Sequence, residues 1–189
     1  MDELKQSINA ALGSEDPIPR QLVREWIQRA ADVEADALLY KLTGEAWNRI
    51  QPHLEAGETR SLIQRYLFRC IQENPKGGIA LSRYEAASEL EAWFDHLVRK
   101  EETREILERA VGGVTTLFLT GDDDIRAAIE TGFLEHVLEQ VTMRPLFSHW
   151  AYDERLQEAW RQALAWGEAH PNFTKGLREQ LRAAQLDQE

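Results

Sequence analysis

The 189-residue sequence contains one cysteine, Cys70, so no disulfide bond can form within the chain. Residues 1–17 lack the basic start and the apolar run of a secretory signal peptide. No uninterrupted apolar stretch approaches the length of about 18 residues that a membrane-spanning helix needs. We therefore expect a cytoplasmic protein that does not cross a membrane.

Glycine and proline are scarce, with 11 and 6 residues, and apolar residues recur mostly three and four positions apart. This pattern predicts an all-α protein, either a compact multi-helix bundle or a short irregular α-solenoid of about eight to ten helices. No segment has the composition of an interdomain linker. We therefore predict a single all-helical domain over residues 1–189, with residues 1–19 and 174–189 at its periphery.

Three segments carry clear local signals. Residues 58–74 have apolar side chains over more than half of the helical circumference, which predicts a central helix. Ser82 and Glu85 have the spacing of a capping box that begins the next helix. The β-branched run at residues 114–119 would also suit a strand. Because a lone strand in a helical chain has no partner, we interpret this run as buried helix.

The apolar pattern changes phase within residues 122–141. Ile125, Ala128 and Ile129 lie on one arc of a helical wheel, whereas the apolar residues from Phe133 onward lie on another, and Gly132 stands at the junction. Two short helices joined by a tight corner would bury both arcs. We therefore predict a corner near Gly132.

The run Gly121–Arg126, followed by Gly132–Glu135, resembles the short helix, corner and longer helix of armadillo or HEAT repeats. It is also similar to small bacterial all-helical proteins of the toxin-immunity type. No repeat recurs at a fixed period of about 34 to 47 residues, as a solenoid of several units should show. The resemblance implies a binding protein and supplies no catalytic residues.

The common motifs for catalysis and cofactor binding do not occur. Neither glycine-rich phosphate-binding pattern, G-x-x-x-x-G-K-[ST] or G-x-G-x-x-G, is present. The nearest approach to a metal-ligand cluster, Glu135 with His136 and Glu139, falls on a face that we interpret as solvated. Cys70 lies within an apolar arc, which is typical of a buried, inert thiol. We predict no metal, no cofactor and no catalytic residue.

Acidic residues exceed basic ones, which gives a formal net charge of -11 and opposes binding to nucleic-acid backbones. The excess is concentrated in residues 81–160, which hold 8 Lys and Arg against 17 Asp and Glu, a net charge of -9. Residues 1–80 have a net charge of only -2, and residues 161–189 are neutral. One interpretation is a solubilising surface, and the other is an acidic platform for a basic partner.

These observations predict a non-enzymatic interaction module that captures a basic protein surface, such as an immunity protein, an enzyme inhibitor or a mimic of DNA charge. The alternative is a small helical enzyme or ligand-binding protein with an interhelical pocket, in which Glu135, His136 or Cys70 would act. The oligomeric state stays open. The predicted partner-binding residues are seven acids and two aromatic anchors: Glu85, Glu89, Asp95, Glu102, Asp123, Glu135, Glu139, Trp150 and Tyr152.

Overall fold

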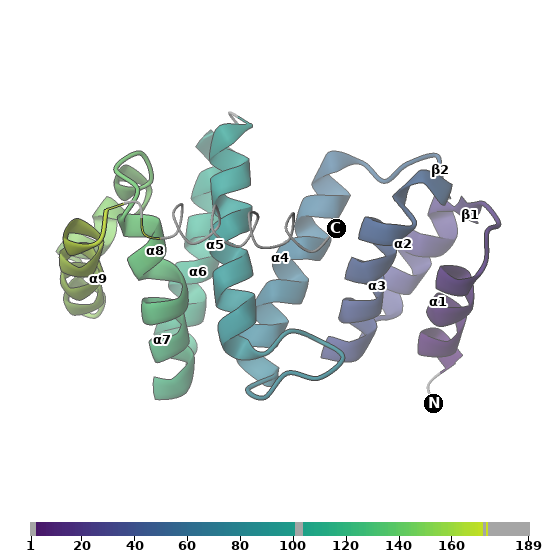
Figure 1. Ribbon diagram of the computed structural model, residues 1–189, viewed down its shortest axis with the longest axis horizontal. Coiled ribbons are helices and arrows are strands. Elements are labelled where there is room, and N and C mark those ends of the chain that lie inside the picture. The colour runs from purple at the N-terminus through teal and green to yellow at the C-terminus, as the bar shows by residue number, and fades with distance from the viewer. Residues whose placement is uncertain (1–2, 101–103, 172, 174–189) are drawn as a thin grey trace, which may run out of the picture. The chain divides into compact units, whose positions relative to one another are not determined.

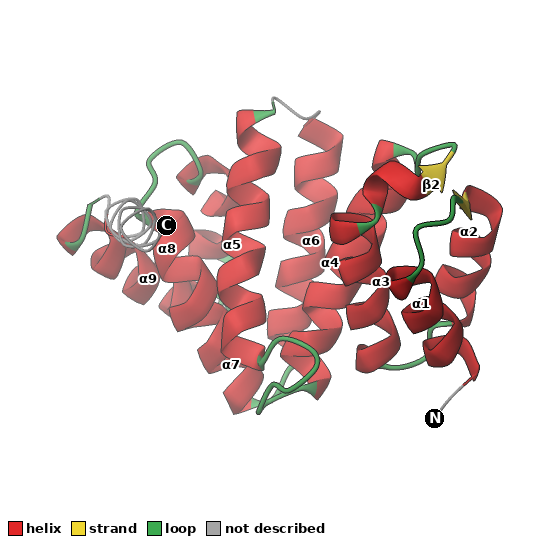
Figure 2. Ribbon diagram, turned by 45° about the vertical axis from the view of Figure 1, so that its right-hand side comes forward, coloured by secondary structure: helices red, strands yellow, loops and turns green. Residues whose placement is uncertain are grey.

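A computed structural model describes residues 3–100, 104–171 and 173. Within these residues the chain forms nine α-helices and two strands of two residues each, which confirms the prediction of an all-α fold (Figures 1 and 2). None of the described helices is both long enough and apolar enough to cross a bilayer. The α-helices are α1 (Glu3–Gly13), α2 (Arg20–Arg29), α3 (Val33–Glu45), α4 (Ala56–Glu73), α5 (Arg83–Arg99), α6 (Arg104–Thr120), α7 (Asp123–Ile129), α8 (Glu135–Leu138) and α9 (Gln157–Ala169).

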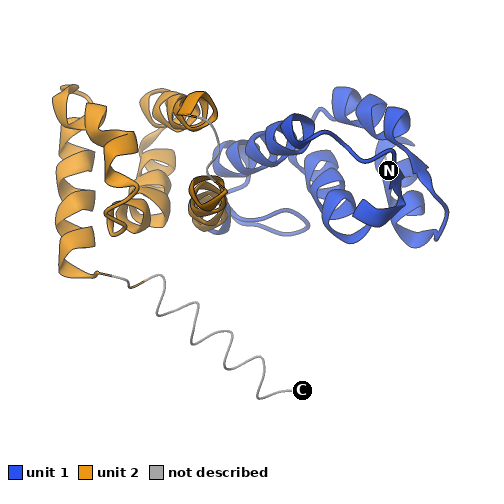
Figure 3. Ribbon diagram, turned by 90° about the horizontal axis from the view of Figure 1, so that it is seen from above, with its two compact units in different colours: residues 1–86 blue, residues 87–189 orange. Residues whose placement is uncertain are grey.

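The chain divides into two compact units, residues 1–86 and residues 87–189 (Figure 3). The boundary falls inside helix α5 rather than in a loop. Our expectation that residues 1–189 fold as a single domain stays a prediction.

Unit 1 is built around α3, which packs against both α1 and α4. Asp32 caps α3 by accepting a hydrogen bond from the Ala35 backbone N–H at 2.9 Å. The core contains fully buried aliphatic residues such as Ile8, Leu39 and Leu62. Strands β1 (Ile18–Pro19) and β2 (Ile50–Gln51) pair in parallel, with Ile18 opposite Ile50, and fix the loops that lead into α2 and α4.

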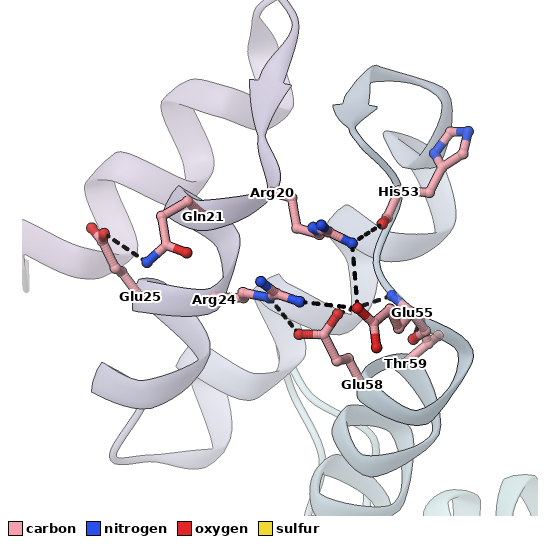
Figure 4. A network of polar contacts seen from close by, with 8 residues as sticks. All are labelled: Arg20, Gln21, Arg24, Glu25, His53, Glu55, Glu58 and Thr59. Carbon is pink, nitrogen blue, oxygen red and sulfur yellow. Dashed lines mark hydrogen bonds and ion pairs between the residues drawn. The ribbon is translucent and has the colours of Figure 1, made fainter.

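Buried and half-buried ion pairs connect α2 and α3 to α4. Arg20 and Arg24 of α2 reach Glu55, and Arg24 also donates a hydrogen bond to Glu58 at 2.5 Å (Figure 4). Glu55 and Glu58 form the capping box of α4. The fully buried Asp36 of α3 pairs with two arginines of α4. These contacts add ion pairs to the apolar packing that already joins α2, α3 and α4.

Helix α4 and the start of α5 follow the sequence prediction. The structure places α4 at Ala56–Glu73 with Cys70 fully buried, close to the predicted range 58–74. The capping box before α5 is formed, because the Ser82 backbone N–H donates to Glu85 at 2.7 Å and the Glu85 N–H donates to Ser82 Oγ at 3.4 Å. Helix α6 covers the whole β-branched run, so the interpretation of residues 114–119 as helix is confirmed. Val114, Leu117 and Phe118 are buried as expected, whereas Thr116 is exposed.

An aromatic cluster fills the core of unit 2. Phe94 of α5 contacts Phe133 and Phe147, with ring centroids 5.2 and 5.8 Å apart. Phe147 and Trp150 belong to the 3₁₀ helix η3 (Arg144–Tyr152), and the Trp150 ring lies 5.0 Å from Phe118 of α6. A 3₁₀ helix repeats every three residues, so Phe147 and Trp150 fall on the same side of it. This spacing turns both rings into the core.

The predicted corner near Gly132 is wrong. Helices α7 and α8 are joined by a five-residue π-helix, η2 (Glu130–Leu134), and the axis continues without a break. In a continuous α-helix, the apolar stripe of Ile125, Ala128 and Ile129 would resume at Gly132. The next apolar stripe begins at Phe133 instead, so the phase break amounts to one residue. A π-turn absorbs one additional residue by using i to i+5 hydrogen bonds. Leu134, five residues after Ile129, is thereby buried on the same face as Ile129.

Candidate interaction sites

The predicted partner-binding residues separate into exposed and buried groups. Glu85, Glu89 and Asp123 are exposed, and Tyr152 is 88% exposed. Glu135 is half-buried. Glu102 lies outside the described residues. The exposed acids therefore provide only part of the platform that the sequence predicts.

Three predicted contact residues are buried, and for them the expected exposure is wrong. Asp95 is 8% exposed and pairs with Arg99 at 2.7 Å, and Glu139 is 6% exposed. Trp150 is fully buried, and its indole N–H donates to Thr115 Oγ1 at 2.9 Å. The burial of Trp150 follows from the 3₁₀ conformation of η3. It cannot anchor a partner in this conformation.

The burial of Asp95 follows from the surroundings of α5. Buried side chains occupy most of the circumference of this helix, including Ala87, Trp93 and the acid Glu91. Glu91 accepts a hydrogen bond from Gln140 at 2.8 Å. A helical wheel places the acidic residues on the solvent-exposed face, but the solvent-exposed face of α5 is narrow. The prediction that Asp95 is exposed, which depended on its charge, is therefore wrong.

The exposed acids of unit 2 gather where helices begin. At the start of α7, Asp122 caps the helix by accepting from the Ile125 N–H at 2.8 Å. Asp123 pairs with Arg126 at 3.3 Å and is otherwise open to solvent. The start of α7 is therefore an exposed acidic segment.

The π-helix brings together two carboxylates that sequence reasoning did not connect. Glu130 and Glu135 stand five residues apart, and the Glu135 N–H donates to the Glu130 carbonyl oxygen, as in a π-turn. Both side chains are half-buried, and among the described residues neither carboxylate has a hydrogen-bonding or ion-pairing partner. The phase break and the five-residue spacing were visible in the sequence. Without the π-conformation they did not point to a site.

Burial and like charge raise the pKa of both carboxyl groups. For Glu130 the main cause is burial, and repulsion from Glu158 on α9 adds to it. For Glu135 burial again comes first, followed by repulsion from Glu130, while His170 acts in the opposite direction. The folded protein therefore holds negative charge here at a free-energy cost. A nearby cation would reduce that cost.

A groove lies between the π-helix and α9 and is lined by Glu130. Its volume is about 400 Å³, and the buried apolar side chains of Phe118 and Ala159 line it. Glu158 of α9 lines it as well, and so do Arg126 and Arg155. Another groove, of about 630 Å³, lies between α6 and η3 and is lined by exposed His149 and by the Arg104 and Glu108 ion pair.

The face around His136 is not the solvated face that we expected. His136 is half-buried, its Nδ1 lies 3.9 Å from Glu139 Oε2, and its ring meets Trp166 edge-on at 4.9 Å. Trp166 also stacks on His170 at 4.5 Å. Among the described residues, no group of three or more His, Cys, Asp or Glu side chains is arranged to hold a metal ion.

Cys70 does not have the properties of a nucleophile. Its side chain is fully buried, and burial raises its pKa to about 11. At neutral pH the thiol is protonated, whereas nucleophilic attack needs the thiolate and access from solvent. Cys70 therefore functions as a core residue.

No protein-family model matches the chain, and neither does any curated protein or solved structure. The resemblance to armadillo or HEAT repeats and to immunity proteins stays a prediction. Any assignment of function therefore depends on the charges and grooves of the chain itself.

Proposed function

We propose that the protein is a non-enzymatic interaction module that binds a basic protein surface through the acidic side chains of its second half. The observation that carries this proposal is the pair of half-buried carboxylates, Glu130 and Glu135, which have no partner among the described residues. Solubility is served by fully exposed acids, because a half-buried charge loses hydration. A cationic partner gives such charges a function.

The distribution of charge supports the same proposal. Residues 81–160 carry a net charge of -9, and the exposed acids Glu89 and Asp123 belong to this part of the chain. Complementary charge raises the rate of association, and salt screens it over about 8 to 10 Å. Tyr152, with 88% of its surface exposed, supplies an aromatic contact. An immunity protein, an inhibitor of a basic enzyme and a DNA mimic are three versions of this function.

The test compares two charge-reversal variants with the same change in net charge. One carries Glu89→Lys and Asp123→Lys, which alter exposed acids of unit 2, and the other carries Glu15→Lys and Glu45→Lys, which alter exposed acids of unit 1. Each variant and the wild type are immobilised and exposed to cell lysate at low and at high salt. Captured proteins are quantified by mass spectrometry, and the association rate is then measured with the leading purified partner.

The proposal predicts that wild type and the unit 1 variant capture the same basic proteins at low salt. The unit 2 variant should lose them and show an association rate lower by about tenfold or more. Equal loss in both variants would indicate a net-charge effect without a defined surface. Equal retention in both would also overturn the proposal.

A further inference from the structure

The groove between the π-helix and α9 combines an apolar lining with an acid that has no partner. Phe118 of α6 and Ala159 of α9 are buried residues that line it, and Glu130 lines it from the π-helix. Its volume of about 400 Å³ lies at the small end of the range for ligand pockets. This volume is large enough for a single long side chain.

The charged groups around the groove are unequally engaged. Arg126 donates to the Phe118 carbonyl oxygen at 3.3 Å and pairs with Asp123, and Arg155 is held by Asp153 at 3.1 Å. Glu158 accepts from Arg161 at 2.6 Å. Glu130 alone among the charged residues lining the groove has neither a hydrogen-bonding nor an ion-pairing partner within the described residues. The groove therefore contains one negatively charged group, the Glu130 carboxylate, that lacks a partner among the described residues.

We propose that this groove accepts one lysine or arginine side chain of the protein partner, with its methylene stem on Phe118 and Ala159 and its cationic group at Glu130. This inference rests on the proposed function and deepens it by assigning a recognition site. Long basic side chains bury their aliphatic stems on apolar surface while the charged end stays at a polar group. The groove supplies both kinds of surface.

Other ligand classes suit the groove less well. An anionic group would meet the repulsion of Glu130 and Glu158, and both lining arginines already bind acceptors of this chain. A metal ion needs several converging ligands, and no such group occurs among the described residues. A neutral ligand would leave Glu130 without a partner. A basic side chain is the ligand that would contact the apolar lining and also pair with Glu130.

The test uses two short peptides that differ at one central position. One carries a single lysine among alanine and glycine residues, and the other carries norleucine, which has an apolar side chain without the amine. Each peptide is titrated into the full-length protein and followed by amide chemical shifts in ¹H–¹⁵N NMR spectra. The same titrations are run on Glu130→Gln and on the control Glu154→Gln, which removes an exposed acid that does not line this groove.

The lysine peptide should shift amides at Phe118, Glu130 and Ala159, and Glu130→Gln should weaken its binding by about five- to tenfold. Glu154→Gln should leave the affinity unchanged, and the norleucine peptide should produce no shifts in the groove. Because Glu130→Gln removes a costly charge, we expect this variant to fold. Shifts spread evenly over the exposed acids, or equal affinity in wild type and Glu130→Gln, would overturn the inference.

The outcome is separable from that of the proposed function. Glu89→Lys alone, which alters no ion-pair partner of a residue that lines the groove, should leave the lysine titration of the groove intact while it weakens capture of basic proteins. If capture fails in every protein but the groove binds lysine, the interaction function is wrong, and only the affinity of the groove for a basic side chain stands. If capture succeeds and the groove does not bind lysine, only the groove assignment is wrong.

Discussion

The carboxylate of Asp36 is fully buried between two guanidinium groups of α4. Arg69 Nη1 approaches it at 2.8 Å, and Arg65 donates to its other oxygen. Arg65 also donates to the Ile27 carbonyl oxygen at 2.9 Å, so the same side chain connects α4 to α2. Removal of one member of a buried charge group leaves the others without compensation. Asp36 therefore contributes to the packing of α2, α3 and α4.

We predict that Asp36→Ala lowers the free energy of unfolding by about 3 kcal/mol. Glu45→Ala, which removes an exposed acid from the same helix, should change it by less than about 0.5 kcal/mol. Chemical denaturation followed by circular dichroism measures both values. A cost for Asp36→Ala as small as that of the control would show that the arginines are satisfied by solvent.

Trp150 and Tyr152 stand two residues apart and have opposite surroundings. Trp150→Ala should lower the free energy of unfolding by about 3 to 5 kcal/mol, because it removes a large buried ring and the hydrogen bond to Thr115. Tyr152→Ala should change it by no more than about 0.5 kcal/mol, since the side chain is 88% exposed. Thermal unfolding of the two variants tests this contrast, which two equal effects would contradict.

At the scale of elements, the π-helix η2 determines which face of α8 is turned toward the core. The apolar residues on its two sides belong to one continuous stripe only when one residue between Ile129 and Phe133 is left out of the count. The i to i+5 hydrogen bond from the Glu135 N–H to the Glu130 carbonyl oxygen accommodates this additional residue in a wider turn. The same bond places the two half-buried carboxylates on one turn. Core packing and the candidate site therefore depend on a single turn.

Deletion of Thr131, which is exposed and lies in this turn, should convert the π-turn to α-helix and preserve the apolar stripe. We expect a loss of no more than about 1 kcal/mol, or roughly 2 to 4 °C in Tm. Insertion of an alanine after Thr131 should instead rotate Phe133 away from the core and cost about 3 to 5 kcal/mol. Circular dichroism melts compare the two variants. A deletion as damaging as the insertion would refute the explanation of the phase break.

Helix α9 approaches α8 closely at Gly167. A Cβ atom at this position would lie 2.6 Å from the Glu139 backbone nitrogen, so the helices would have to separate. We predict that Gly167→Ala destabilises the protein by about 1 to 3 kcal/mol. Gly112→Ala in α6 meets no atom within 4 Å and should stabilise it by up to about 1 kcal/mol through helix propensity. Changes of the same sign, measured by denaturant unfolding, would contradict this prediction.

For the whole molecule, the raised pKa values of Glu130 and Glu135 predict how stability depends on pH. In the unfolded chain these carboxyl groups return to the ordinary pKa of 4.5. The folded protein binds the two protons more tightly, so their contribution to stability is fully present below 4.5 and is lost as pH rises through the raised values. Carboxyl groups with lowered pKa, such as Glu58, lose their contribution only as pH falls below the ordinary range.

We therefore expect the Tm difference between wild type and the double variant Glu130→Gln, Glu135→Gln to depend on pH. Wild type should be less stable than the variant at neutral pH, and the difference should shrink as pH falls toward 4.5. Differential scanning calorimetry across this range measures it, and the comparison cancels groups common to both proteins. A difference that stays constant with pH would show that the two carboxyl groups have ordinary pKa values.

Much of the helical framework could be predicted from local pattern, and the placement of the acids could not. The capping box at Ser82 and the breadth of the apolar arc around Cys70 are local signals, and the structure confirms both. Asp95 and Trp150 are buried by residues distant in sequence, through a wide buried arc on α5 and a 3₁₀ helix that composition does not reveal. The groove at Glu130 needs α6, α7, the π-helix and α9 together. No single segment encodes it.

The π-helix also has a consequence for how the sequence is expected to vary among relatives. A polypeptide one residue shorter at positions 130–132 would fill the same core with an ordinary α-helix, so packing gives no reason to keep the additional residue. An additional residue of this kind is expected to persist when something other than stability favours it, and π-turns are frequent at functional sites. An alignment of relatives should therefore permit a one-residue gap at this turn. Relatives that share the gap would be expected to have lost the half-buried carboxylates as well.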